Sequence, residues 1–146
     1  MDVFTQFVQN KYIYMPFLLW FAIQIFKLIY DLVTTKKFNF KRLMGAGGMP
    51  SSHSAVVCVL ATLVGKYEGV DSAVFAVAVI MAFVVMYDAC GVRRAAGKQA
   101  ALLNKLVETP GLTGVQVSEK LVEVLGHTPV QVFVGALIGV IAGLIA

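Results

Sequence analysis

Charged residues are scarce in this sequence. Of its 146 residues, 12 are Lys or Arg and 8 are Asp or Glu, so 14% of the chain is charged while 59% is hydrophobic. Soluble domains have about 45–50% apolar and about 25% charged residues. A soluble protein of this size would have too little polar surface to cover its core, so the composition predicts a single domain, 1–146, embedded in lipid.

Cysteine is rare as well. Cys58 and Cys90 form no CxxC pair and no disulfide framework, so they say little about the compartment. The N-terminus has Asp2 where a signal peptide has positive charge, and its first apolar run is too long to be cleaved, so we expect that run to stay as an anchor. The net charge of +4 suits anionic lipid or a phosphate-bearing substrate. We expect no nucleic-acid partner, because the basic residues stand between apolar segments.

Long apolar runs predict membrane helices. The run 12–33 has 22 residues, and a bilayer requires about 20 at a rise of about 1.5 Å each. The run 72–87 is a second strong span. The segment 129–146 is a further one, with glycine at every fourth position to give a flat face for close helix packing. The segment 51–66 is short for a span, so it is either a buried helix or a tilted one.

The remaining segments are more polar. Residues 1–12 predict a short interfacial helix, and 95–107 and 115–125 predict surface helices because their apolar and charged positions are mixed. The turn between the second and third apolar segments is 66–71. The expected fold is therefore all-α: an integral membrane helical bundle with three to four membrane-embedded helices plus short surface helices.

Three crossings would place the loops 34–50 and 88–127 on the same side of the membrane. The first loop holds four basic residues and no acid, whereas 66–71 holds one lysine and two acids. The positive-inside tendency puts the two long loops in the cytoplasm, and phosphate binding is an alternative reason for their charge. We expect the chain in a bacterial plasma membrane with its active site on the cytoplasmic face.

Both histidines of the chain begin helices on that same face, in the stretches GGMPSSHS and LGHTP. One histidine can attack phosphorus while a second protonates the leaving oxygen. The alternative is that His53 and His127 are unrelated residues at helix starts. The glycine-rich turn before His53 leads into a helix N-terminus, which suits a phosphate, and Ser51 and Ser52 add hydroxyl donors.

Several other charged residues lie toward that face. Lys27 stands inside the first span, where a cation costs about 2.5–3.5 kcal/mol and is a functional candidate, although snorkelling or pairing with Asp31 is an alternative. Arg93 and Arg94 suit the oxygens of a phosphoryl group, or else anchor the chain as positive-inside residues. Asp88 orients a histidine, pairs with an arginine or marks the interface.

Taken together, these residues resemble the phosphatidic-acid-phosphatase type 2 (PAP2) superfamily, and more closely its small divergent branch of membrane proteins. That pattern is a lysine followed by an arginine, then P-S-G-H, then an arginine followed by a G-x-H-x-P segment. The matching stretches run from Lys27 to Gly139 and include Pro50-Ser51-Ser52-His53, Tyr87-Asp88-Ala89-Cys90-Gly91-Val92-Arg93-Arg94 and Gly126-His127-Thr128-Pro129.

The resemblance implies a membrane phosphatase that hydrolyses a lipid phosphate or pyrophosphate monoester through a phosphohistidine, without metal or cofactor. His127 would attack phosphorus and His53 would protonate the leaving oxygen. The remaining phosphate oxygens would be held by Lys27, Arg42, Ser52, Arg93 and Arg94. The substrate would be a phosphorylated lipid of the surrounding bilayer, such as phosphatidic acid, phosphatidylglycerol phosphate or a polyprenyl phosphate.

The chain departs from the superfamily pattern in several places. No proline follows Arg42, Ser52 replaces a glycine, and the segment 95–125 separates the arginine pair from His127. Gln131 stands where the superfamily has a carboxylate that orients the nucleophilic histidine. The charge would then come from Asp88 or Glu123, or the reaction is slow, or the protein binds phosphate without turnover.

Two other functions compete with the phosphatase. Gln131 suggests a non-catalytic membrane protein that binds or transports lipid headgroups. Vanadate-dependent haloperoxidases share the phosphate-binding residues, but they are soluble and larger. Three or four spans make a thin bundle, so we also expect a homo-oligomer, formed by dimerisation through the glycine faces, unless 95–125 packs under the site.

Overall fold

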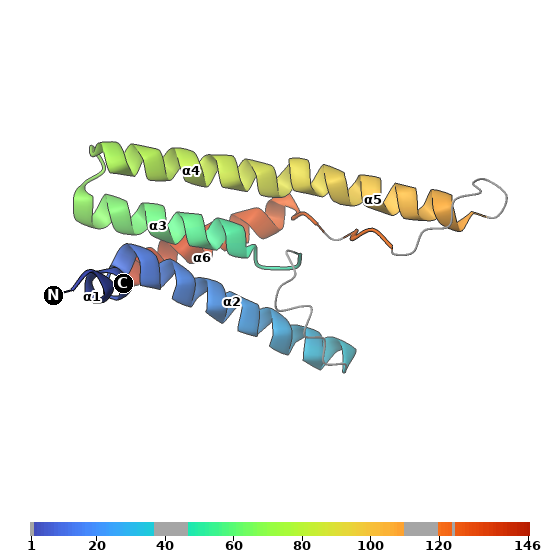
Figure 1. Cartoon of the computed structure of the whole chain (residues 1–146), viewed down its shortest axis with the longest axis horizontal. Coiled ribbons are helices and arrows are strands. Elements are labelled where there is room, and N and C mark those ends of the chain that lie inside the picture. The colour runs from blue at the N-terminus through green and yellow to red at the C-terminus, as the bar shows by residue number, and fades with distance from the viewer. Residues whose placement is uncertain (1, 37–46, 110–119, 124) are drawn as a thin grey trace.

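The computed structural model describes residues 2–36, 47–109, 120–123 and 125–146. Regular secondary structure within these ranges is entirely helical, which confirms the all-α prediction (Figure 1). The helices are α1 (Val3–Val8), α2 (Lys11–Thr35), α3 (Ser52–Glu68), α4 (Ala73–Cys90), α5 (Val92–Glu108) and α6 (Pro129–Ile145). Each apolar run of the sequence forms one helix, and α1 is the short helix expected near the N-terminus.

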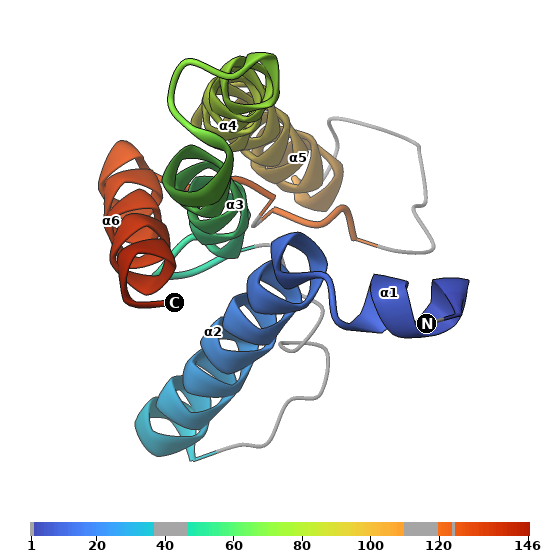
Figure 2. The ribbon, with the colours of Figure 1, turned by 90° about the vertical axis from the view of Figure 1, so that its left-hand side faces the viewer.

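The central helix of the bundle is α3, which packs against α2, α4 and α6 (Figure 2). As its central position requires, the α3 side chains of Ala55, Val59 and Leu63 are almost completely buried. The prediction of a buried helix is therefore confirmed for 51–66. The helix continues to Glu68, so the turn begins later than the predicted residue 66.

Helix α6 packs closely against α3. A Cβ atom on Gly135 would lie 2.3 Å from the carbonyl oxygen of Ser51, and one on Gly139 would lie 2.4 Å from that of Ala55. Only glycine allows such a close approach of two helix backbones. The predicted flat face of α6 is thus used inside the chain, so dimerisation through the same face is wrong.

Helix α5 continues the direction of α4 after Gly91 and extends beyond the other helices (Figure 1). It begins three residues before, and ends one residue after, the helix expected over 95–107. The prediction of a second helix over 115–125 is wrong for the part that the structure describes, because 120–123 and 125 are not helical. There the Asn104 side chain replaces helical hydrogen bonding: it donates to Leu121 O and accepts from Leu121 N, both at 2.9 Å.

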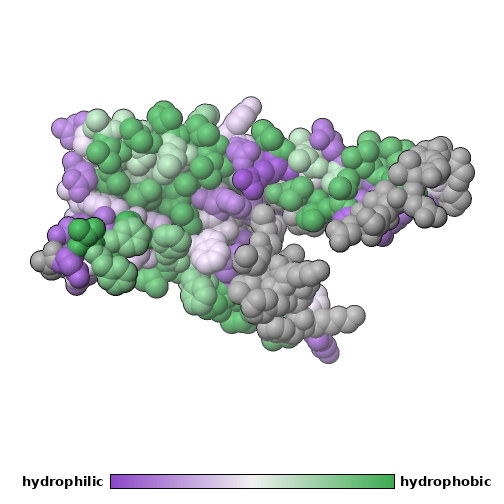
Figure 3. All heavy atoms as spheres, viewed as in Figure 1, coloured by the Kyte–Doolittle hydropathy of each residue, from purple (hydrophilic) through white to green (hydrophobic). Residues whose placement is uncertain are grey.

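The outer surface of the bundle is strongly apolar (Figure 3). Phe17, Phe83 and Phe133 expose 66%, 64% and 69% of their surface. Two helical stretches are long and apolar enough to cross a membrane, Lys11–Thr35 and the continuous Ala73–Glu108, and α6 is a shorter apolar helix. Only 17% of the most apolar part of each long stretch is buried, so these side chains face outward rather than into a core.

Candidate active site

The site begins at the turn that leads into α3. Gly48 has a φ of +91°, a left-handed conformation that favours glycine, and the chain then reaches Ser51 at the N-cap of α3. The Ser51 hydroxyl accepts from the backbone N–H of Ser54 at 3.3 Å. Ser52 is buried in the first helical turn and His53 follows it, so both lie at the positive end of the α3 dipole.

Hydrogen bonds tie three helix ends together at this point. The backbone N–H of Ser51 donates to Gln131 O at 3.1 Å, which joins the start of α3 to the start of α6. The backbone N–H of His127 donates to Ala89 O at 2.9 Å, which joins the residue before α6 to the end of α4. Residues that are distant in the sequence are held side by side by backbone contacts.

The two histidines meet where these ends converge. The rings of His53 and His127 have centroids 5.7 Å apart and an interplanar angle of 64°. His127 is completely buried at 1% exposure, whereas His53 is half-buried. The expected proximity of the histidines is therefore observed, although geometry alone does not assign their chemical roles.

Gln131 fixes the orientation of His127. Its Oε1 lies 3.3 Å from His127 Nδ1 and also accepts from the backbone N–H of Thr128 at 3.0 Å. Gln131 and Thr128 form a reciprocal capping box at the start of α6, which holds the amide in place. Because an amide oxygen only accepts, this contact favours the tautomer with the proton on Nδ1 and the lone pair on Nε2. Within the described residues, Nε2 has no hydrogen-bond partner.

The surroundings favour a neutral His127. Burial is the largest cause and lowers the pKa of His127 below its ordinary value of 6.5. The positive charge of Lys27 and the neighbouring His53 ring act in the same direction, while Gln131 and the nearby Gly48 carbonyl oppose the shift. A neutral imidazole with a lone pair on Nε2 is the form that can act as a nucleophile.

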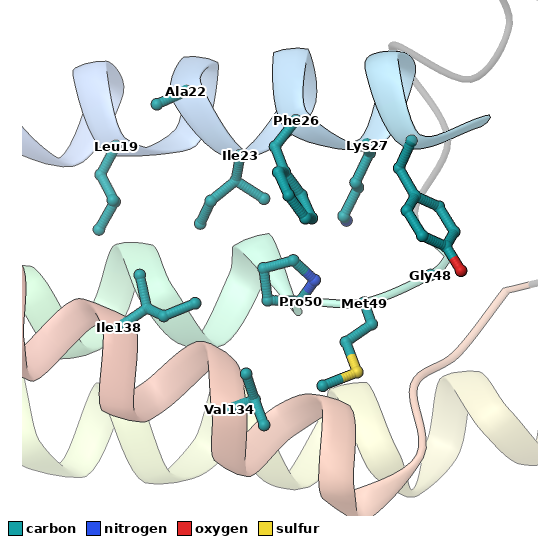
Figure 4. A pocket seen from close by; sticks show the side chains of 11 residues that line it. Leu19, Ala22, Ile23, Phe26, Lys27, Gly48, Met49, Pro50, Val134 and Ile138 are labelled. Carbon is teal, nitrogen blue, oxygen red and sulfur yellow. The ribbon is translucent and has the colours of Figure 1, made fainter. Parts of the chain in front are cut away.

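Lys27 is the charged residue most deeply placed near the histidines. It is 4% exposed on α2, and its side chain points toward the turn that carries Gly48 and Pro50 (Figure 4). Its charge acts electrostatically on both His53 and His127. This places the cation where it can contact an anion held between the rings.

The arginine pair borders the site from the start of α5. Arg93 Nε lies 2.5 Å from Asp88 Oδ2 in a half-exposed ion pair, and the Arg93 charge acts on His53. Arg94 is exposed, but its backbone packs closely: a Cβ on Gly126 would lie 2.3 Å from Arg94 N. Gly126, the residue before His127, therefore lies against the backbone of the arginine pair despite their distance in sequence.

Sequence comparison identifies the family of the chain. A family described as "Divergent PAP2 family" matches residues 8–142, a range that includes every candidate residue of the site. The chain belongs to the Divergent PAP2 family. It is 40% identical over 133 residues to the uncharacterized membrane protein YuiD of Bacillus subtilis (strain 168), covering 84% of each chain. No solved structure matches it.

The three residues of this Divergent PAP2 protein that were candidates for orienting His127 make different contacts. Gln131 contacts His127, while Asp88 pairs with Arg93. Glu123 accepts from Asn104 Nδ2 at 2.8 Å and belongs to the contact between α5 and the 120–123 segment. The amide of Gln131, not a carboxylate, thus stands beside the ring. Arg42 lies outside the described residues.

Sequence reasoning missed two features. Gln24, a polar residue one turn before Lys27 in the same apolar run, is 3% exposed on α2. The close contact of Gly126 with the Arg94 backbone was not predicted, although Gly126 belongs to the motif that contains His127. Within the described ranges, no three His, Cys, Asp or Glu side chains gather in a way that could hold a metal ion.

Proposed function

We propose that this Divergent PAP2 family protein is an integral membrane phosphatase that hydrolyses a lipid phosphate or pyrophosphate monoester through a phosphohistidine intermediate. The observation that carries the proposal is the pair of histidine rings 5.7 Å apart, brought together by backbone hydrogen bonds that join the starts of α3 and α6 and the end of α4. Lys27 is a buried cation on α2, beside the turn that leads into α3.

Membrane insertion is supported by the outer surface and by the relative. Phenylalanine side chains face outward on α2, α4 and α6, and such a continuous apolar surface is not stable in water. YuiD carries the description of a membrane protein. We place the chain in a bacterial plasma membrane, with the histidines on the cytoplasmic face as the positive-inside tendency predicts. A homo-oligomer remains a prediction and would require a surface other than the glycine face of α6.

The proposed reaction has two balanced steps. His127 Nε2 donates its lone pair to phosphorus, the bond from phosphorus to the ester oxygen breaks, and protonated His53 gives its proton to that oxygen. A water molecule then attacks phosphorus, neutral His53 takes its proton, and the phosphorus–nitrogen bond breaks. Free phosphate leaves and both histidines regain their starting forms.

The charges around the rings stabilise the transferred group. Lys27 contacts the phosphoryl oxygens from α2, Arg93 and Arg94 from α5, and the backbone N–H groups at the start of α3 from the third side. Arg42 and Ser52 are assigned to the same role by the family resemblance. Charge spread over these donors is greatest in the transition state, where such contacts contribute most to the rate.

The test is phosphate release by detergent-purified protein from a panel of phosphatidic acid, phosphatidylglycerol phosphate and polyprenyl phosphates. His127→Ala and His53→Ala should each abolish release. Asp71→Asn, in the exposed turn at the opposite end of the bundle, is the matched control and should retain full activity. All proteins are compared by helical content and melting temperature, so that misfolding is recognised.

A second function is favoured by one observation, the uncharged Gln131 beside His127. A protein that binds or transports lipid headgroups needs the cations but not an ionised orienting group. Absence of release from every substrate, by folded protein that still binds phosphatidic acid, would support this function. Release that only the histidine substitutions abolish would eliminate it.

A further inference from the structure

An apolar pocket of about 580 Å³ lies between α2, α6 and the turn before α3 (Figure 4). Leu19, Ile23 and Phe26 line it from α2, and Val134 and Ile138 from α6. Among the described residues that line it, Lys27 is the one charged residue.

The two ends of the pocket differ in character. Leu19 and Ile138 line one end, and Lys27 lies at the other, near Gly48 and Pro50 (Figure 4). Phe26 and Tyr30 of the same lining expose 54% and 62% of their surface, so the pocket also borders the apolar exterior of the bundle. The pocket therefore reaches the candidate active site at its Lys27 end and borders the proposed lipid-facing surface.

We propose that this pocket binds one hydrocarbon chain of a phosphorylated lipid and thereby places the lipid's phosphate at Lys27. The location of the phosphate rests on the proposed function. The occupant follows from charge complementarity: the ligand must be apolar along its length and anionic at one end. A sugar phosphate would leave hydroxyl groups unpaired against Leu19 and Ile138.

The pocket acts by positioning the lipid, not merely by offering an apolar surface. Lipid tails contact any apolar surface in a bilayer, so an apolar lining by itself does not select a substrate. A concave pocket that ends at Lys27 instead restricts one chain to a path that leads the attached phosphate to the histidines. Restricting two reacting groups in this way raises the rate of their reaction.

The first experiment blocks the pocket. Ala22 lines it from an exposed position of α2, so Ala22→Phe fills the space without overpacking the core. Ile29→Phe enlarges a 55% exposed residue of the same helix that does not line the pocket, and it is the matched control. We expect Ala22→Phe to lower kcat/KM for phosphatidic acid at least tenfold, to leave glycerol phosphate unaffected, and Ile29→Phe to change neither. Equal effects on both substrates, or none, would overturn the proposal.

The second experiment needs no turnover. Trp20→Phe first removes the single tryptophan of the chain, and Ile138→Trp then places a fluorescent reporter in the pocket. If that variant misfolds, Leu19→Trp serves as the reporter instead. Phosphatidic acid with brominated chains should quench this fluorescence at least twofold more strongly than phosphatidylcholine with the same chains at equal mole fraction. Lys27→Met should remove the difference.

The two proposals can fail separately. Selective quenching without hydrolysis of any substrate would retain the chain-binding pocket and reject the phosphatase. Hydrolysis of phosphatidic acid with equal quenching by both lipids would retain the phosphatase and reject the pocket as its chain site. Loss of quenching on addition of inorganic phosphate alone would show an anion site without a lipid requirement, and would likewise overturn the pocket proposal.

Discussion

At the scale of single residues, Gln131 occupies the position beside His127, the proposed nucleophile, where the superfamily has a carboxylate. Its amide oxygen accepts from both the Thr128 N–H and the His127 ring, so one side chain caps α6 and selects the Nδ1–H tautomer. What it does not supply is negative charge. His127 is therefore oriented for attack, while the positive ring that forms in the transition state lacks a counter-ion.

This arrangement predicts the pH dependence of kcat/KM. Only neutral His127 attacks, and its pKa is lowered mainly by burial, so the acid limb should lie below pH 6.5. Gln131→Glu places a carboxylate beside the ring while glutamate keeps the capping box. The carboxylate raises the pKa of His127, so the acid limb should move about 1–3 pH units upward.

The measurement is the pH–rate profile of the wild type and Gln131→Glu on one substrate, because the substrate's own titration then cancels. Above the new limb, Gln131→Glu should be the faster enzyme, since its charge stabilises the imidazolium. Gln131→Leu is the control and should lower turnover about 10²-fold or more by releasing the tautomer. Superimposable profiles for the wild type and Gln131→Glu would contradict the assigned contact.

The roles of the two histidines can be separated with 4-nitrophenyl phosphate, whose leaving group needs no proton. His53→Ala should still form the phosphohistidine and release about one nitrophenolate per site in a burst. Later turnover should be about 10²–10⁴-fold slower, because no base then activates water. His127→Ala should give neither burst nor turnover. Loss of the burst in His53→Ala would mean that His53 does not act as acid and base.

At the scale of helices, sequence periodicity was sufficient to place most elements. Long apolar runs give α2, α4 and α6 within a few residues of their observed ends, because helix length and lipid thickness leave little choice. The helix predicted over 115–125 was wrong for its described part. There Asn104 satisfies the backbone of the 120–123 segment, and a tertiary hydrogen bond of this kind has no local signature.

The candidate site, too, was predicted only in part from the sequence. The histidines and Lys27 were found because polar residues are conspicuous in an apolar chain. Their partners were not: the contact of Gly126 with Arg94, and the apolar pocket beside Lys27, depend on the angles at which helices cross. Such angles arise from the packing of whole helices and are not encoded in the spacing of neighbouring residues.

The contact of α6 with α3 should be sensitive to single substitutions. Gly139→Leu places a branched side chain where even a Cβ would lie 2.4 Å from Ala55 O, so the two helices must separate. We expect a loss of about 1–3 kcal/mol in the free energy of unfolding, typical of overpacking, and loss of phosphatase activity because His127 precedes the displaced helix. Thermal unfolding in detergent measures the first effect.

The matched control is Leu137→Ala on the outer side of α6, where Leu137 is 49% exposed. It should change neither stability nor activity appreciably, because Leu137 does not belong to the buried core of the described residues. A stable and active Gly139→Leu protein would show that α6 can shift without disturbing the histidines. The backbone link between Ser51 and Gln131 would then not position the site.

At the scale of the whole molecule, the two ends of the bundle have different tasks. The histidines, Lys27 and the arginine pair gather at one end. At the other end, hydrogen bonds tie the helices: the Tyr12 hydroxyl donates to Glu68, Lys66 to Leu144 O, and the Tyr67 hydroxyl to Ala146 O, the last two at 3.1 Å. Both termini lie near this second end (Figure 1), so the chain begins and finishes opposite its site.

This polarity predicts which side of the membrane each end faces. Cys90 is half-buried at the end of α4 beside the site, whereas Asp71 is exposed in the turn at the opposite end, and Cys58 is buried between them. A membrane-impermeant maleimide should therefore label the wild-type protein in inverted vesicles and not in intact bacterial cells. In a Cys90→Ser background, Asp71→Cys should be labelled in intact cells.

Cys58 serves as the internal control, because a Cys90→Ser protein should remain unlabelled from either side until it is unfolded. Labelling of Cys90 in intact cells would place the histidines outside the cell and show that the basic loops serve phosphate binding rather than orientation. Labelling of Cys90 and of the cysteine at position 71 from one side would mean that α4 does not cross the bilayer. In that case the apolar surface of α4 would have to be covered by a second copy of the chain, which the subunit mass in detergent would reveal.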